Sequence, residues 1–280
     1  MNPNRIIYSA ALFTLGEFRC PPENPRWRQV NVNGTRPLVA FPGTSVVIHQ
    51  QQREPVLANP NHVIFYGVGQ RYRRLLHDER GDHCLFVEID PALLAGCDAI
   101  AFVVAPSDPR AYLRLRLAAH TLRDSLSIEE SVYDAVGRSI EAGAALHGRR
   151  RATARTRTEQ DHHELVEQTK ALLTERASGH DSLESIARHV HASEFHLARV
   201  FRDRTGFTLH GYRTHLRLRL ALDRLRTDTD LATIANELGF NSHSHFTDAF
   251  RGVFGVPPSE ARRDLRELRR MLEARLTHRS

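Results

Sequence analysis

A segment near the C-terminus occurs twice, and this repeat constrains the fold more than any other feature of the chain. Each copy has an Ile-Ala pair, a serine, a phenylalanine and a glycine, at Ile186, Ala187, Ser193, Phe201 and Gly206 and again at Ile234, Ala235, Ser242, Phe250 and Gly255. Serine caps helix N-termini, and glycine adopts the left-handed conformation that ends helices. Each copy therefore predicts a short helix, a tight turn and a second helix, which is the helix-turn-helix pattern.

The second helix of such a motif enters the major groove of DNA. In the first copy Leu197, Val200 and Phe201 share one face and are expected to be buried. The cap and the remaining positions form the first predicted DNA-binding set: Ser193, Glu194, Phe195, Ala198, Arg199 and Arg202. Arginine suits guanine, glutamate accepts from cytosine, and an outward phenylalanine contacts a thymine methyl. For Arg199 the alternative is a surface salt bridge.

In the second copy the expected buried face is Phe246, Ala249 and Phe250. The cap and outward positions form the second predicted set: Ser242, His243, Ser244, Thr247, Asp248 and Arg251. Arg251 is placed for a phosphate, whereas Asp248 repels phosphate unless it accepts from a cytosine amine. A helix over 212–225 connects the copies. Two rigidly linked readers need groove faces about 34 Å apart, one helical turn, or a bent site.

The charge of the chain is concentrated in the half that carries the repeat. Residues 1–147 hold 15 basic and 15 acidic side chains, whereas residues 148–280 hold 24 and 18. The net excess of +6 on this half suits a polyanionic partner, and the alternative is an ordinary solvated surface. The sequence has no apolar run of about 20 residues, no secretory signal and no CxxC among its three cysteines. It therefore predicts a cytoplasmic protein with no membrane partner.

The first half is predicted to be β-rich. Runs at 46–48, 63–66 and 84–89 are short and rich in β-formers, which indicates a small barrel or sandwich. Helical spacing follows at 111–126 and 128–146; these helices form a dimer interface or only cover the sheet. Five arginines and almost no apolar residue at 148–158 then predict a flexible linker, whose arginines are also candidates for phosphate contacts.

Residues 165–262 resemble the DNA-binding domain of the AraC/XylS family of bacterial transcription regulators. The resemblance rests on Ser193-Glu-Phe-His-Leu-Ala-Arg-Val-Phe201 and on the run from Ile234 to Phe246. The chain departs from the family at Leu209, where proline is usual, and at His191, where a turn glycine is usual. Residues 59–72 and 84–90 resemble, more weakly, the family's cupin-like regulatory domain. That resemblance implies a domain that senses a small molecule or dimerises.

The expected fold class is thus α+β with two domains. Residues 1–147 form a cupin-like β-barrel with two following helices, for effector binding or dimerisation. Residues 148–160 form an Arg-rich linker, and residues 161–280 form an all-α domain with two helix-turn-helix units. Polar residues near predicted strand ends are candidates for the effector pocket: Arg71, Tyr72, His77 and His83. Their alternative is an ordinary surface or loop position.

The predicted function is sequence-specific DNA binding that regulates transcription, under the control of a small-molecule effector or of dimerisation. The expected partners are double-stranded DNA at two adjacent major-groove sites, a second copy of the chain, an effector and RNA polymerase. No cofactor, metal or catalytic residue is expected, because the β-rich half has no HxH motif. One rival is a cupin-type enzyme fused to a DNA-targeting domain. Another is a regulator without a ligand.

Overall fold

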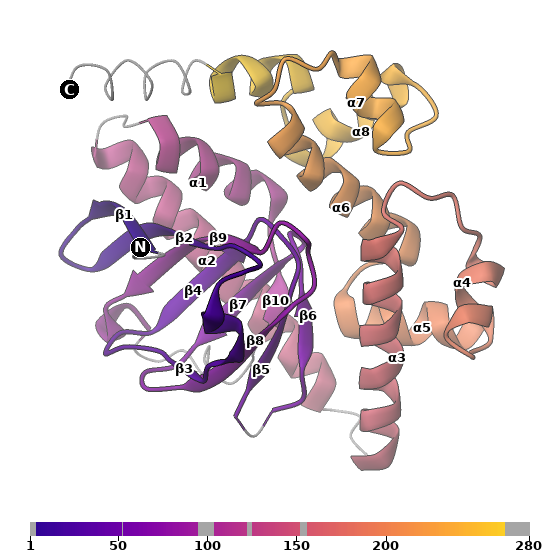
Figure 1. Cartoon of the computed structure of the whole chain (residues 1–280), viewed down its shortest axis with the longest axis horizontal. Helices are drawn as coiled ribbons and strands as arrows, with labels where there is room; N and C mark the ends of the chain where they lie inside the picture. Colours follow the sequence, from indigo (N-terminus) through magenta and orange to yellow (C-terminus); the bar gives the residue numbers. More distant parts are fainter. Residues whose placement is uncertain (1–3, 52, 95–103, 122–124, 152–155, 267–280) are drawn as a thin grey trace.

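The first half is built on a six-stranded antiparallel sheet (Figure 1). The computed structural model describes residues 4–51, 53–94, 104–121, 125–151 and 156–266. The strands, in sheet order, are β1 (Asn4–Ser9), β2 (Phe13–Cys20), β9 (Asp82–Ile89), β4 (Leu38–Pro42), β7 (His62–Tyr66) and β10 (Val104–Pro106). The strands predicted at 63–66 and 84–89 are confirmed as parts of β7 and β9.

Both faces of this sheet are buried, because alternate side chains point to opposite sides. On β4, Val39 and Phe41 join the core beneath the helices, whereas Ala40 faces a second sheet. On β7, Val63 and Phe65 belong to the same core beneath the helices, whereas Ile64 and Tyr66 face the second sheet. The continuous apolar runs in the sequence are explained by this two-sided burial.

The second sheet has four strands in the order β3 (Asn31–Val32), β8 (Arg71–Leu76), β5 (Val46–Gln50) and β6 (Val56–Ala58). No strand pairing joins it to the first sheet within the described residues, so the predicted closed barrel is wrong and the sandwich alternative holds. One edge of each sheet is a three-residue strand covered by a helix, with β10 against α2 (Ser125–Arg151) and β6 against α3 (Thr156–Glu175). Pro106 also removes a ladder donor at the β10 edge. Two 3-10 turns complete the half, at Pro25–Arg28 and Pro91–Leu94.

Helix α1 (Pro109–Thr121) and α2 cover the six-stranded sheet. Tyr112 and Leu115 of α1 and Ile128 and Val132 of α2 are buried in the same core as β2, β4 and β9. Of the two roles expected for these helices, covering the sheet is confirmed. A dimer interface on their other faces stays a prediction.

Helix occupies most of the segment predicted as a flexible linker. Helix α2 continues through Arg151 and α3 begins at Thr156, while residues 152–155 lie outside the described residues. Arginine has a high helix propensity, so a run of arginines without glycine or proline does not interrupt a helix. The polar composition of this segment did not distinguish an irregular linker from a polar helix.

The second half continues with α4 (Leu183–His189), α5 (Glu194–Thr205), α6 (Leu209–Arg224), α7 (Leu231–Glu237) and α8 (His243–Phe254), and residues 258–266 are again helical. Helix α1 lies between the sheets and the group α6–α8, and α3 lies beside β6 (Figure 1). The apolar core is continuous across this boundary, because Leu222 and Phe250 belong to the same cluster as Leu115 and Val39. The two halves are therefore packed together.

Buried polar contacts reinforce this packing at α6. The side-chain amide of Asn59 donates to the Tyr212 hydroxyl over 2.8 Å, and that of Asn61 donates to the Tyr212 carbonyl over 2.9 Å. Arg219, which is 2% exposed, donates to the carbonyl of Ser107 over 2.7 Å. Each hydrogen bond joins one half of the chain to the other, so the position of α6 on the β-rich half is fixed by specific contacts.

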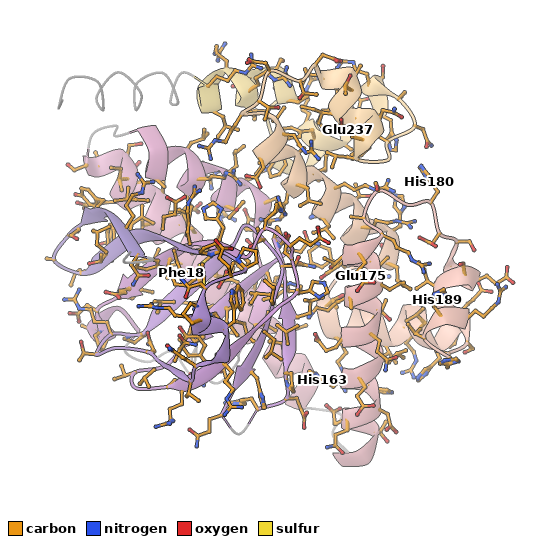
Figure 2. All side chains as sticks on the ribbon, in the orientation of Figure 1. Phe18, His163, Glu175, His180, His189 and Glu237 are labelled. Atoms are coloured by element: carbon orange, nitrogen blue, oxygen red, sulfur yellow. The ribbon has the colours of Figure 1, made fainter. Side chains whose placement is uncertain are left out.

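Charged groups and a histidine add further contacts between the halves. Arg116 of α1 forms an ion pair with Asp223 of α6. Near the start of α3, Nε2 of His163 lies 2.8 Å from the carbonyl oxygen of Pro55 (Figure 2). The contacts thus extend along α3 as well as α6, and they restrain how the second half is oriented on the first.

Two histidines, the buried His62 and the half-buried His215, predict a loss of stability in mild acid. Burial, then the charges of Lys170 and Arg219, hold the pKa of His62 well below its usual value, and burial lowers the pKa of His215 to about 4. The unfolded chain binds these protons near pH 6.5 and the folded chain does not, so folding free energy is lost as pH falls below that value. Each histidine contributes up to about 1.4 kcal/mol per pH unit. Urea titrations at pH 7.5, 6.5 and 5.5 measure this slope.

The variant His62→Gln is expected to reduce the slope between pH 6.5 and 5.5, because it removes one of the two protons. The exposed His180, in the second half of the chain, offers a control, and His180→Gln is expected to keep the wild-type slope. Equal slopes for His62→Gln and the wild type would contradict the role given to His62.

No helix in the described ranges is long and apolar enough to cross a membrane. Cys20 and Cys84 are free thiols, and Cys97 lies outside the described residues.

Candidate nucleic-acid interface

The first helix-turn-helix unit consists of α4 and α5, and its caps are those expected from the sequence. The Ser193 hydroxyl accepts from the amide of His196 at the start of α5, and Gly206 ends the helix at φ 79°. Leu197, Val200 and Phe201 are buried, as predicted. Local capping and a single apolar stripe thus fix which face of α5 remains open.

The open face of α5 is exposed in the manner that base reading requires. The side chains of Glu194, Arg199 and Arg202 are exposed, and Phe195 is 80% exposed, which is unusual for so large an apolar side chain. Ala198 is half-buried beside the apolar stripe. The structure therefore brings most of the first predicted set together on one accessible surface.

The second unit consists of α7 and α8 and repeats this geometry. Asp230 caps α7, Ser242 accepts from the amide of His245 over 3.1 Å, and Gly255 ends α8 at φ 84°. Phe246 and Phe250 are buried. On the outer side the exposed residues are His243, Ser244, Asp248 and Arg251. Thr247 differs from the rest of the predicted set, because its hydroxyl is buried and has no hydrogen-bond partner among the described residues.

The turns of the two units share one backbone hydrogen bond, although the second turn is one residue longer. The amide of Ala192 donates to the carbonyl of Ala187 over 3.0 Å, and Phe240 donates to Ala235 over 2.9 Å at the equivalent place. The residue just before each donor is left-handed, His191 at φ 53° and Gly239 at φ 75°. The first unit thus places a histidine where only glycine is free of strain.

One arginine that the site prediction did not include ties the two units together. Arg217 of α6 is buried and donates to the carbonyls of Ala177 (2.6 Å), Gly179 (2.6 Å) and Gly239 (2.7 Å). Burial, then the charge of Arg213, lowers its pKa to about 10, which leaves it protonated at neutral pH. The segment before α4 and the turn after α7 are therefore held by a single guanidinium. The only available signal was the helical spacing that places Arg217 beside Leu216 and Leu218 on a buried helix.

The four predicted effector residues do not converge in the structure. Arg71 is exposed at the start of β8, whereas Tyr72 is half-buried and lies 4.5 Å from Tyr66, ring centre to ring centre. His77 follows the far end of β8. His83 borders a cavity at the junction of the two halves, with Nε2 2.6 Å from a carboxylate oxygen of Glu17. Within the described residues, no group of three or more His, Cys, Asp or Glu side chains is arranged to hold a metal ion.

Comparisons with known proteins place this geometry in a family. Residues 186–264 match a family model described as a helix-turn-helix domain. The regulatory protein SoxS of Escherichia coli K12 is 31% identical over 105 residues, which are 37% of this chain and 98% of SoxS. The chain belongs to the AraC-type regulators. It is also 36% identical over 88 residues to the RCS-specific transcriptional activator RclR of E. coli.

The curated relatives match about a third of this AraC-type chain, and the family model matches its C-terminal part. The match to RclR covers 31% of RclR, and the match to the arabinose operon regulatory protein of Salmonella typhimurium covers 31% of that protein. A solved AraC-type transcriptional regulator from Chromobacterium violaceum is 27% identical over 36% of this chain and 91% of its own, with a TM-score of 0.35.

Proposed function

We propose that the protein regulates transcription by binding double-stranded DNA with α5 and α8 in adjacent stretches of major groove. The observation that carries the proposal is the repeated unit, in which a serine cap and a buried apolar stripe leave one helix face exposed twice. The membership of the AraC-type regulators supports the same function. The expected role for the N-terminal half is control of this activity.

The base contacts proposed for α5 follow from its exposed side chains. The planar guanidinium of Arg199 matches guanine O6 and N7, and the carboxylate of Glu194 accepts from the cytosine amine. Phe195 has no apolar neighbour large enough to bury it, and a thymine methyl supplies one. Arg202 and Arg251 are proposed to contact phosphates, which position the protein and carry no sequence information.

The separation of the two readers is proposed to be fixed by α6 and by the hydrogen bonds of Arg217. Because these connections are buried, the two exposed helix faces are expected to move as one body. Such a body fits sites about one helical turn apart, or a site that bends to meet both faces. The bases between the two contacted stretches then contribute through DNA deformability alone.

The variant Arg199→Ala is expected to lose roughly 1–3 kcal/mol on the best DNA site and little on random duplex. The reason is that a paired hydrogen bond to guanine is present only at the matching base. Fluorescence anisotropy on both duplexes at one salt concentration measures the difference. The exposed Arg73 on β8 is a matched control, and Arg73→Ala is expected to change neither affinity. Equal weakening on both duplexes would assign Arg199 to phosphate, and no effect would remove it from the interface.

We further propose that a small-molecule effector and a second copy of the chain act through the N-terminal half. The packing of α1 against α8 and of α3 against β6 supports direct transmission, since both halves share one apolar core. A change in how the sheets seat on α6 therefore changes the placement of the DNA-binding faces. Paired half-sites would bind a homodimer more tightly than a monomer. RNA polymerase is the proposed downstream partner.

A further inference from the structure

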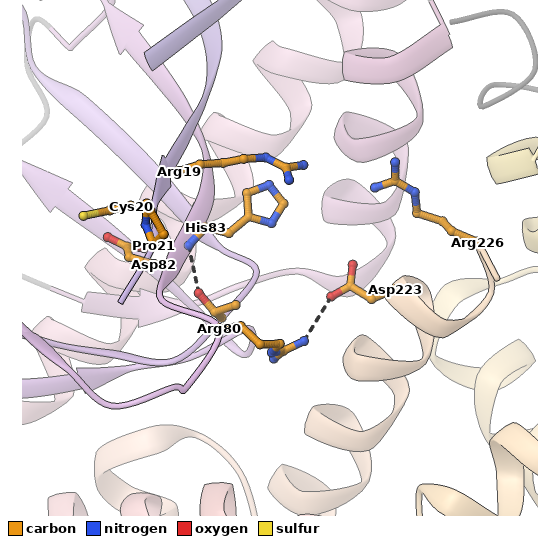
Figure 3. Close-up of a pocket in the computed structure, with 9 residues that line it drawn as sticks. Arg19, Cys20, Pro21, Arg80, Asp82, His83, Asp223 and Arg226 are labelled. Carbon is orange, nitrogen blue, oxygen red and sulfur yellow. Dashed lines mark hydrogen bonds and ion pairs between the residues drawn. The ribbon is translucent and has the colours of Figure 1, made fainter. Parts of the chain in front are cut away.

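A cavity of about 540 Å³ lies where the β-rich half meets the end of α6 (Figure 3). Its walls come from the end of β2, the turn before β9 and the C-terminal end of α6, and the lining residues that matter here are Arg19, Arg80, His83, Asp223 and Arg226. The volume is within the range of about 300–1,000 Å³ that is typical of small-molecule sites. Both halves of the chain contribute to the same cavity.

The acidic groups at this cavity already have cationic partners. Asp82, on the wall of the cavity, pairs with the buried Arg74 at 2.8 Å. Asp223 pairs with Arg116, and it also lies 3.8 Å from Arg80 across the junction. Asp223 and Glu17 attract the remaining cation, Arg226, through space, but neither carboxylate forms a hydrogen bond or ion pair with it within the described residues.

Glu17, next to the cavity, also forms ion pairs with neighbouring arginines. Its carboxylate lies 2.7 Å from the guanidinium of Arg5 and 2.9 Å from that of Arg19. The hydrogen bonds from His83 and Arg19 keep the pKa of Glu17 far below its usual value, against the opposing effect of burial. A single carboxylate thus serves two guanidinium groups and the His83 ring, and Arg19, which lines the cavity, keeps further donors.

Arg226 is the cation with least compensation. No hydrogen bond or ion pair is recorded for its guanidinium within the described part of the chain, although the side chain is half-buried. Burial, then the charge of Arg116, lowers its pKa. In Figure 3, Arg226 extends from the helical half and Arg19 from the strand half toward the same space. Two guanidinium groups that point into one space from opposite sides provide paired donors for an anion placed between them.

We propose that this cavity binds a small organic anion, a carboxylate or a phosphate ester, between Arg226 of the DNA-binding half and Arg19 of the β-rich half. Guanidinium groups bind both kinds of anion through paired hydrogen bonds, so the two share one recognition chemistry. An anion held from both sides favours the docked arrangement of the halves, because it binds that arrangement better than a separated one. The site is thereby an effector site built at the junction, away from the space between the two sheets.

The test is calorimetric titration of the full chain, without DNA, with succinate and separately with inorganic phosphate, against sodium chloride at equal ionic strength. Succinate represents carboxylates and phosphate represents phosphoryl groups, so the stronger of the two identifies the source. We expect saturable binding of at least one, weakened about tenfold or more in Arg226→Gln and in Arg19→Gln, since each loses a charged hydrogen-bond pair.

Two variants separate this site from other basic surfaces. Arg224→Gln removes an exposed arginine of α6 that pairs with Glu237 and does not line the cavity, and it is expected to bind as the wild type does. Arg199→Ala is expected to keep anion binding although it alters DNA binding. Anion binding that is lost in Arg199→Ala and kept in Arg226→Gln would overturn the proposal, as would the absence of binding beyond chloride. Because the titration contains no DNA, neither result tests the proposal that α5 and α8 bind DNA, and the two proposals can fail independently.

Discussion

Replacement of Arg217 by methionine is expected to lower the free energy of unfolding by about 3–5 kcal/mol. Methionine fills a similar volume but leaves the carbonyls of Ala177, Gly179 and Gly239 without their donors. Each buried acceptor that loses its partner costs about 1–3 kcal/mol, and the ring of Phe240 loses the cation beside it. Because the three carbonyls belong to both helix-turn-helix units, the loss is expected in one cooperative transition. Urea denaturation followed by circular dichroism measures it.

Arg224→Met is the matched control, because this arginine lies on the same helix but is exposed and forms one surface ion pair, with Glu237 at 3.3 Å. Surface pairs of this kind contribute about 0–1 kcal/mol. Arg217→Lys retains the charge but not the three-way donor geometry, so its stability is expected to lie between those of Arg217→Met and the wild type. If Arg217→Met and Arg224→Met unfold at the same urea concentration, Arg217 does not hold the units together.

The helices of the DNA-binding half were predictable because their ends are set locally. Ser193, Ser242 and Asp230 cap helices through hydrogen bonds to residues two or three positions away, and Gly206 and Gly255 end them. Such contacts are written into short stretches of sequence and recur in both copies. The exposure of Phe195 followed from the same pattern, since the apolar stripe of α5 leaves that position outside.

The docking of the two halves was not predictable, because the residues that produce it are far apart in sequence. Asn59 and Asn61 resemble turn residues, and nothing near them indicates that both bind Tyr212, about 150 positions later. Arg219 looks like one of many surface arginines, yet it is buried against Tyr112. A long polar side chain that would be exposed on one domain becomes buried when a second domain packs over it. A single sequence does not show where such packing occurs.

This docking also changes how the N-terminal half is expected to act. A flexible tether alters only the local concentration of the second DNA-binding unit. Here α2 and α3 carry helix through most of that segment, and α6 seats directly on the β-rich half. A ligand or a second subunit that binds at the sheets is therefore expected to change the positions of α5 and α8 through these packing contacts, in addition to any effect on local concentration.

Replacement of Gly239 by alanine is expected to cost about 3 kcal/mol or more, from two causes. The residue has φ 75°, where a side chain costs about 1–2 kcal/mol. A Cβ there would lie 2.1 Å from the backbone oxygen of Ser178, so the segment before α4 must shift. That shift moves the neighbouring carbonyl of Gly179 away from Arg217, which adds to the loss. Urea denaturation of the full chain measures the total.

Gly206→Ala separates the two causes, because Gly206 has a similar φ of 79° and an added Cβ would meet only Pro106, at 4.0 Å. Its expected cost is the conformational part alone, about 1–2 kcal/mol. His191 supports this division, since the first unit tolerates a full side chain at φ 53° in the equivalent, exposed turn. The excess of Gly239→Ala over Gly206→Ala therefore measures how tightly the turn of the second unit is packed against the start of the first. Equal costs would mean that the Ser178 segment moves freely, and the two units would then be less rigidly joined than the hydrogen bonds of Arg217 imply.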